Sequence, residues 1–178
     1  NTVDDAAGEA FDKGARLLGL KYPGGPEIEK ASIAGNAKFV DFPRPKVKKS
    51  KYNFSFSGLK TSLMYYLKGM DDKDIVSNLP HIAASYQEAI IDTLLIRIER
   101  ITKSENINEV SIAGGVAANK RFREKAKLLS EKNNLNIYFP PFNLCTDNAG
   151  MIAMAGYEKL NKGFSSKLTL EANPNLTL

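Results

Sequence analysis

The sequence predicts an α/β fold with a helical first part. In the second half, two short apolar segments of strand character alternate with two helical segments, an order typical of α/β folds. In the first half, apolar residues recur at the three- and four-residue spacing of amphipathic helices. No apolar run in the 178 residues is long enough to span a bilayer, so we expect no membrane partner.

The first helix is expected within residues 4–19, DDAAGEAFDKGARLLG. At about 100° per residue, one stripe of this helix is apolar and should be buried. That stripe contains Ala7, Phe11, Ala15 and Leu18. The opposite face contains Asp5, Glu9, Asp12 and Arg16. Solvent contact is the default explanation for such a face, and the spacing alone gives its carboxylates no further role.

A short turn sequence, Tyr-Pro-Gly-Gly-Pro at residues 22–26, then interrupts the helical pattern. Pro26 suits the first turn of a second helix, which we expect through residues 27–31 and ending near Gly35. Residues 36–56 are expected to be irregular or β-like.

The longest helix is expected over residues 74–103, after a third helix that begins at Gly58 with Ser57 as its cap. Residues 69–74 should link the two. Apolar residues recur along the longest helix at helical spacing: Ile82, Tyr86, Ala89, Ile90, Leu94 and Ile98. Pro80 should end or kink its first part.

The second half supplies the strands. We expect strands over residues 109–113 and 136–139, each followed by a helix, over residues 119–131 and 147–160. The first strand should be buried, and Gly114-Gly115 follows it directly. Pro140-Pro141 should end the second strand.

Composition limits the kinds of site that the chain can build. The single cysteine, Cys145, excludes an intramolecular disulfide and indicates a reducing, cytoplasmic compartment. The single histidine, His81, excludes a metal site built from several histidines of this chain, and we interpret it as a structural residue. The net charge of +5 mildly favours a polyanionic partner. A helix that opens within the first five residues suggests a fragment or a processed chain.

A candidate nucleotide site lies in Ala113-Gly114-Gly115-Val-Ala-Ala-Asn119. Glycines between a strand and a helix let a ligand approach the backbone, and a helix N-terminus offers free N–H donors. Asn119 could then hydrogen-bond a ribose or a base. The motif is neither GxGxxG nor a P-loop, so a tight turn without a ligand explains it equally well.

Two shorter motifs also have two interpretations. In Cys145-Thr-Asp-Asn148, Thr146 or Asp147 is a helix cap, or Asp147 is a metal ligand at a helix start. The cap is the better explanation from these residues alone. Ser57-Gly-Leu-Lys60 matches the S-x-x-K of penicillin-recognising acyl enzymes, but no S-D-N or K-T-G follows it. We therefore favour Ser57 as a cap.

Several long motifs occur in one order along nearly the whole chain: DDAAGEAFDK, YPGGP, FPRP, FSFSGLKT, IAGGVAAN and LCTDNAGMIA. Together they resemble the TsaD family of tRNA N6-adenosine threonylcarbamoyltransferases. The resemblance implies an actin-like ATPase fold of two ribonuclease-H-like lobes. It also implies transfer of a threonylcarbamoyl group from threonylcarbamoyl-AMP to N6 of the adenosine 3′ of the anticodon, in tRNAs reading codons that begin with A.

The same resemblance implies that the chain is the C-terminal lobe of this fold with a helical insertion. The family's H-x-x-x-H metal motif and its Ser-Gly-Gly-His phosphate loop, assigned to the N-terminal lobe, are not in this sequence. Residues 1–70 would be a helical or irregular subdomain that contacts the nucleotide, and residues 71–178 the ribonuclease-H-like α/β core. We therefore expect the chain to be inactive alone.

The resemblance also assigns site residues. Asp12 and Glu29 would contact the ribose, Gly25 would bring its backbone to the nucleotide, and Asn119 would lie at the adenine. Asp147 would bind one divalent metal, iron or zinc, shared with histidines of the N-terminal lobe. The metal would act as a Lewis acid, and no covalent nucleophile is required.

Five cations lie within eight residues beside two prolines: Arg44, Lys46, Lys48, Lys49 and Lys51. A solvated loop is their default explanation. With tRNA as the implied substrate, we expect Lys48, Lys49 and Lys51 to contact its phosphates. The resemblance further implies two protein partners, an inactive paralogue and a small ATPase. Two other functions stay open: a different actin-fold ATPase or sugar kinase, and a non-catalytic paralogue acting as an interaction module.

Overall fold

The computed structural model describes residues 2–45, 47 and 52–171. The chain divides into two compact units, Asn1–Cys145 and Thr146–Leu178, which we call unit 1 and unit 2 and describe separately. The predicted functional division at residue 70 is a different one, and it stays a prediction.

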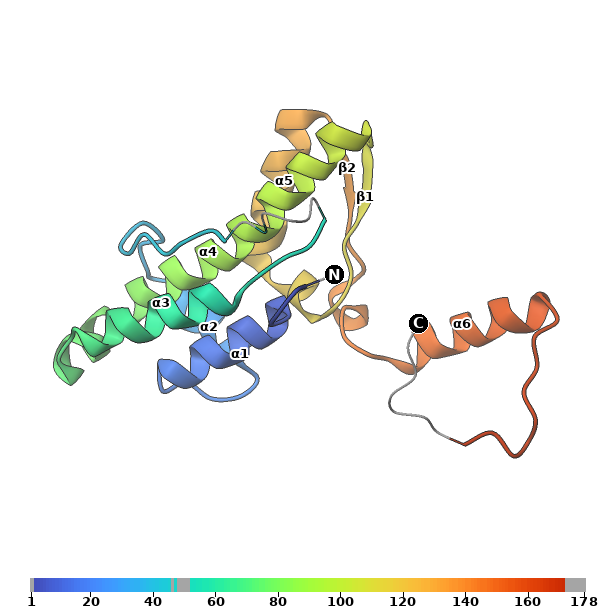
Figure 1. The fold of residues 1–178 in the computed structure, drawn as a ribbon, viewed down its shortest axis with the longest axis horizontal. Coiled ribbons are helices and arrows are strands. Elements are labelled where there is room, and N and C mark those ends of the chain that lie inside the picture. Colours follow the sequence, from blue (N-terminus) through green and yellow to red (C-terminus); the bar gives the residue numbers. More distant parts are fainter. Residues whose placement is uncertain (1, 46, 48–51, 172–178) are drawn as a thin grey trace. The chain divides into compact units, whose positions relative to one another are not determined.

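Most of the described chain is helical, with one small parallel sheet, so the α/β prediction is confirmed at this level (Figure 1). Unit 1 contains α1 (Ala7–Leu17), α2 (Gly24–Ser32), α3 (Ser57–Lys68), α4 (Asp72–Glu105), β1 (Glu109–Ser111), the short 3-10 helix η1 (Gly115–Ala118), α5 (Lys120–Asn133), β2 (Asn136–Tyr138) and a second 3-10 helix, η2 (Phe142–Leu144). Unit 2 contains α6 (Ala149–Asn161).

Helix α1 buries the stripe that its periodicity predicts. Phe11, Ala15 and Leu18 are buried, and Asp12 on another face is half-buried. A Cβ at Gly14 would lie 2.2 Å from a ring carbon of Tyr86 on α4, so only glycine permits this approach. The Tyr86 hydroxyl donates to the Ala10 carbonyl at 3.0 Å, and burial raises the pKa of Tyr86.

Two hydrophobic clusters share α4. The first is formed by α1, α2, α3 and the first part of α4, with Phe11, Ile28, Leu59 and Tyr86 among its buried residues. The second is formed by the later part of α4, α5 and residues near the sheet, with Phe122 and other side chains. Figure 1 shows α4 passing from the three N-terminal helices to α5 and the two strands. Helix α4 therefore positions both groups of elements.

The start of α3 differs from the prediction. Ser57 is the first residue of the helix rather than its cap. The cap is supplied from the N-terminal segment: one carboxylate oxygen of Asp4 accepts the backbone N–H of Phe56 at 2.7 Å and of Ser57 at 3.3 Å. Burial alone would raise the pKa of Asp4, but these bonds and those from the Ser55 and Ser57 hydroxyls together lower it.

The expectation that a helix ends at Pro80 is also wrong. Helix α4 continues through Pro80, from Asp72 to Glu105. Packing on both sides of the proline explains this result. A Cβ at Gly35 would lie 2.0 Å from the Pro80 carbonyl oxygen, so the chain after α2 lies directly against the helix there. From Ile82 onward, the inner face of α4 is buried. This burial offsets the cost of a proline inside a helix, about 3 kcal/mol.

The strands pair as expected for an α/β unit, in parallel and with α5 between them in sequence. Val110 lies opposite Ile137 in the register. The expectation that the first strand is buried is wrong, because Val110 is half-buried and its neighbours Glu109 and Ser111 are exposed. A parallel strand is buried only where helices or other layers cover both of its faces. Among the described residues, this sheet has two strands.

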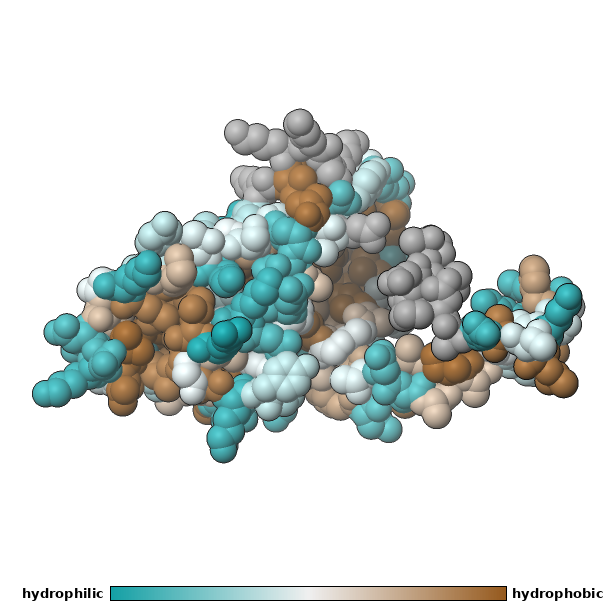
Figure 2. Space-filling model, turned by 60° about the horizontal axis from the view of Figure 1, so that its bottom comes forward, coloured by the Kyte–Doolittle hydropathy of each residue, from teal (hydrophilic) through white to brown (hydrophobic). Residues whose placement is uncertain are grey.

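Unit 2 has one described helix, α6, whose residues are all exposed. Its cap is Asn148, whose Oδ1 accepts the backbone N–H of Met151 at 3.0 Å. Hydrophobic residues at the surface of this unit are visible at the right-hand end of Figure 2. Across the described part of the chain, no helix combines the length and apolar character needed to cross a membrane.

Candidate functional site

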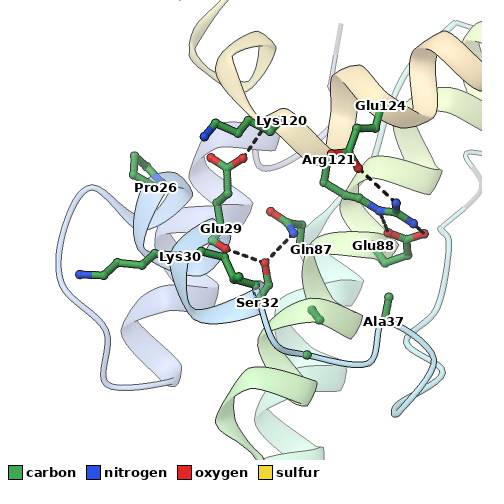
Figure 3. Close-up of a pocket in the computed structure, with 13 residues that line it drawn as sticks. Pro26, Glu29, Lys30, Ser32, Ala37, Gln87, Glu88, Lys120, Arg121 and Glu124 are labelled. Atoms are coloured by element: carbon green, nitrogen blue, oxygen red, sulfur yellow. Dashed lines mark hydrogen bonds and ion pairs between the residues drawn. The ribbon is translucent and has the colours of Figure 1, made fainter.

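An open pocket of about 620 Å³ lies in unit 1 where α2, α4 and the start of α5 meet. Glu29 and Lys30 of α2, Glu88 of α4, and Lys120 and Arg121 of α5 are among the residues that line it (Figure 3). The pocket thus presents charged groups of both signs.

One side of the pocket is an ion-pair cluster between α4 and α5. The Arg121 guanidinium donates to both carboxylate oxygens of Glu88, at 3.0 and 3.1 Å. Lys125 pairs with Glu88 and with Asp92. Burial alone would raise the pKa of Glu88, but the hydrogen bonds from Arg121 and Lys125 together lower it. Glu88 is therefore held in its ionised form.

The other side of the pocket contains Glu29, which joins α2 to α5. Its carboxylate accepts the backbone N–H of Lys120 at 2.6 Å. Lys120 is the first residue of α5, so this carboxylate occupies one of the N–H donors that a helix start leaves free. Of the four predicted substrate-contacting residues, Glu29 is the one that lines the pocket.

Asn119 lies immediately before Lys120 and caps α5. Its Oδ1 accepts the backbone N–H of Phe122 at 2.9 Å, and its Nδ2 donates to Gln87 Oε1 at 2.7 Å. The residue is 7% exposed. An amide oxygen has two lone pairs and an amide nitrogen two hydrogens, so each atom retains capacity for one more bond. Its predicted contact with adenine stays a prediction.

Asp12 and the glycine pair form a second junction, between α1 and α2. Asp12 Oδ1 accepts the backbone N–H of Gly24 at 2.7 Å. A Cβ at Gly24 would lie 2.6 Å from the Asp12 Cα, so this position requires glycine, whereas a Cβ at Gly25 would meet open space. Gly25 is half-buried, and the space on its Cβ side is open to a ligand. The predicted nucleotide roles of Asp12 and Gly25 are not tested by these contacts.

The four predicted substrate-contacting residues are connected through two hydrogen bonds made at α2. Asp12 holds Gly24, next to Gly25, and Glu29 holds Lys120, next to Asn119. All of these contacts lie in unit 1, and α2 takes part in both junctions.

Asp147 lies in unit 2 and is exposed. The alternative that Thr146 or Asp147 caps the last helix is wrong, since Asn148 is the cap. Among residues 2–45, 47 and 52–171, no three histidine, cysteine, aspartate or glutamate side chains gather as a metal site would require. The described residues therefore do not complete a metal site around Asp147.

His81 and Ser57 both make structural contacts. His81 Nδ1 accepts the backbone N–H of Asn36 at 2.9 Å, and its ring centroid lies 5.2 Å from that of Phe39. The Ser57 hydroxyl donates at 2.8 Å to Asp4, the residue that caps α3.

Most of the predicted basic loop falls outside the part of the chain that the structure describes, including Lys46, Lys48, Lys49 and Lys51. Arg44 is described, and it pairs with Asp92 at 2.7 Å and with Asp41 at 3.2 Å. The expected tRNA contacts of this loop therefore stay predictions.

Sequence reasoning missed most of the residues that line the pocket, and two of them are polar residues of α4. Gln87 and Glu88 lie within α4, where the apolar periodicity drew attention to their neighbours. The available signal was a polar pair inside the helix segment that is otherwise most apolar, Ile82–Ile91.

The comparisons with known proteins agree with the motif resemblance. The family described as "TsaD: tRNA N6-adenosine threonylcarbamoyltransferase" matches residues 1–154. A protein of Thermosipho africanus with the name "tRNA N6-adenosine threonylcarbamoyltransferase" is 53% identical over 177 residues, covering 99% of this chain and 53% of the relative. Relatives of the same name from Kosmotoga olearia and Magnetococcus marinus are 50% and 46% identical, each over 99% of this chain.

Those two relatives are covered over 52% and 50% of their own lengths. The chain thus spans about half the length of the curated relatives that it matches. Since the family match extends over residues 1–154 of 178, the chain belongs to the TsaD family.

Proposed function

We propose that this chain is part of an enzyme that transfers a threonylcarbamoyl group from threonylcarbamoyl-AMP to N6 of the adenosine 3′ of the anticodon, in tRNAs reading codons that begin with A. The names of relatives at 46–53% identity support this proposal. We also propose that unit 1 belongs to the C-terminal lobe of an actin-like, ribonuclease-H-like fold. The parallel β1–α5–β2 arrangement is consistent with such a lobe.

The observation that carries the proposal is the pair of junctions made by α2. One junction places the open space at Gly25 beside Asp12, and the other places Glu29 at the start of α5 beside Asn119. A nucleoside has hydroxyl donors on its ribose and both donors and acceptors on its base. Carboxylates and an amide along one path can bind these groups.

In this proposal the chain binds and orients the adenosine half of the mixed anhydride. The N6 amine of the tRNA adenosine attacks the carbonyl carbon of the threonylcarbamoyl group. The new N–C bond forms as the C–O bond to AMP breaks, AMP leaves with the bonding electrons, and the nitrogen releases one proton to solvent. Holding the electrophile in one orientation accelerates such a step without a covalent nucleophile. Asp12 and Glu29 would fix the ribose, and Asn119 would fix the base.

We further propose that Asp147 is one ligand of a divalent metal, iron or zinc, whose other ligands lie outside this chain. A bound metal would supply Lewis-acid polarisation of an oxygen of the adenylate. The exposed position of Asp147 and its exclusion from the helix cap leave its carboxylate available for this role.

The proposed macromolecular substrate is tRNA, in the cytoplasm. Four lysines within residues 46–51 provide a local surplus of positive charge suited to phosphates, whereas Arg44 is paired with Asp41 and Asp92. Lys48, Lys49 and Lys51 are the proposed contacts. The proposed protein partners are an inactive paralogue and a small ATPase subunit.

A transfer assay tests the proposed function. Threonylcarbamoyl-AMP and a tRNA transcript are incubated with this chain, and in parallel with a protein of the relatives' full length that contains it. We expect modified adenosine with the longer protein and none with this chain alone. Turnover by this chain alone would contradict the shared metal site. Sugar phosphorylation by the longer protein, without modified tRNA, would favour a sugar kinase, and tRNA binding without transfer would favour a non-catalytic module.

A further inference from the structure

Gln87 lies at the centre of the pocket's inner wall and connects its two sides. Its side chain comes from α4, and the residue is 4% exposed. Nε2 donates to the Ser32 hydroxyl at 2.8 Å, and Oε1 accepts from Asn119 Nδ2 at 2.7 Å. Figure 3 shows Gln87 between Ser32 and the start of α5. One buried amide thus bonds α2 and the cap of α5 at the same time.

The bonds of Gln87 continue in both directions. The Ser32 hydroxyl donates to the Glu29 carbonyl at 2.7 Å, and Asn119 Oδ1 accepts from the Phe122 backbone. The Glu29 carboxylate closes a ring by accepting the Lys120 N–H at 2.6 Å. In the described part of the chain, no buried side-chain nitrogen or oxygen is without a hydrogen-bond partner. Each member of the ring therefore depends on the orientation of the next.

We propose that Gln87 is a positioning residue that sets the orientation of Asn119 and the distance between Glu29 and the start of α5. This inference rests on the proposed function only where it concerns a nucleotide. The amide is suited to the task because it donates and accepts at once. An ionised glutamate at this position would accept from Asn119 but could not donate to Ser32, and methionine would make neither bond.

The central test is amide hydrogen exchange in the 178-residue chain, measured by NMR at Phe122 and Lys120. Phe122 reports the Asn119 bond, and Lys120 reports the Glu29 bond. For Gln87→Met we expect exchange at least about tenfold faster at both amides, which corresponds to about 1.4 kcal/mol of local opening free energy. Unchanged exchange at both amides would overturn the proposal.

The control variant is Thr93→Val on the same helix. Thr93 is also buried, but its hydroxyl donates to Ala89 of α4 itself and, among the residues that the structure describes, connects no second element. We expect it to lower the melting temperature without selective acceleration at Phe122 and Lys120. Equal acceleration in this control would show a merely structural effect and would overturn the positioning role.

A second variant, Gln87→Glu, separates the bond to Ser32 from the bond to Asn119. It should retain slow exchange at Phe122, because the carboxylate still accepts from Asn119, and accelerate exchange at Lys120. Loss of protection at both amides, or at Phe122 alone, would contradict the assigned direction of the bonds. This variant also provides a test if Gln87→Met does not fold.

Titration with AMP tests whether the hydrogen bonds of Gln87 affect nucleotide binding. We expect Gln87→Met to weaken AMP binding about tenfold and Thr93→Val to leave it within twofold of the parent chain. Equal AMP affinity in the parent and Gln87→Met would overturn the link. If the parent chain binds no AMP, the proposed nucleotide wall fails, and the exchange data still decide whether Gln87 positions Asn119.

Discussion

Helices α5 and α6 have opposite relations between composition and burial. Helix α5 contains many charged residues, yet Phe122, Ala126 and Leu129 are buried against the second hydrophobic cluster. Helix α6 contains mostly small and apolar residues, and none of them is buried. For these two helices, burial therefore follows from the partners that each helix has and not from its overall hydrophobicity.

The two units also differ in the contacts that stabilise them. Unit 1 has two clusters, a shared central helix, and side-chain bonds between distant segments, such as Asp4 with Ser57 and Glu88 with Arg121. A helix with apolar residues on all sides is usually buried in a larger assembly. We therefore expect α6 to contribute little to the stability of the chain as it stands.

The largest expected effect on stability comes from an alanine substitution in α5, compared with one in α6. Phe122 is 2% exposed and makes an edge contact with Phe139, so Phe122→Ala should lower the free energy of unfolding by about 3–5 kcal/mol. Ile152→Ala in α6 removes a comparable apolar side chain that is 67% exposed, and it should change stability by less than about 0.5 kcal/mol. Urea titration followed by circular dichroism measures both. Similar losses in the two variants would contradict the difference between the helices.

A smaller effect is expected at the long-range cap of α3. Asp4→Ala should cost about 1–2 kcal/mol, because the N–H groups of Phe56 and Ser57 lose their acceptor. Asp4→Asn keeps one acceptor oxygen and should lose clearly less. The same urea titration compares the two variants, and an equal loss would show that charge rather than capping accounts for the contribution of Asp4.

The smallest expected effect depends on pH. The pKa of Glu88 is lowered in the folded chain, so its ion pairs contribute stability above the ordinary value of 4.5. That contribution is lost as the pH falls through the lowered folded value. Glu88→Gln should cost about 1 kcal/mol at pH 7, since these pairs are partly exposed, and should flatten the loss of stability below about pH 4.5. Parallel acid dependence in the parent and the variant would contradict the role of Glu88.

Periodicity predicted the parts of the fold that depend on local sequence. The buried stripe of α1 and the alternation of strands and helices follow from spacing that one segment contains. The errors concern contacts between distant segments. The α3 cap comes from a residue 53 positions away, and α4 continues through Pro80 because Gly35 and the buried residues after it pack there.

The candidate site also has residues that the sequence identified and one that depends on contacts between distant segments. The motifs identified Asp12, Gly25, Glu29 and Asn119 from their residue types and the family resemblance, and the structure connects them through α2. Gln87 was not identified, because the spacing of apolar residues along α4 indicates which face is buried and not which polar residue joins two elements. Its importance depends on which two elements meet at that point of α4.

The central claim is that the two junctions of α2 form a nucleotide-binding wall, and an NMR titration of this chain with AMP tests it most directly. We expect the largest shifts at the backbone amides of Gly24, Gly25, Glu29 and Lys120, and small shifts throughout α6. If AMP causes no saturable shifts, or if the largest ones lie away from both junctions of α2, the proposed nucleotide wall is contradicted.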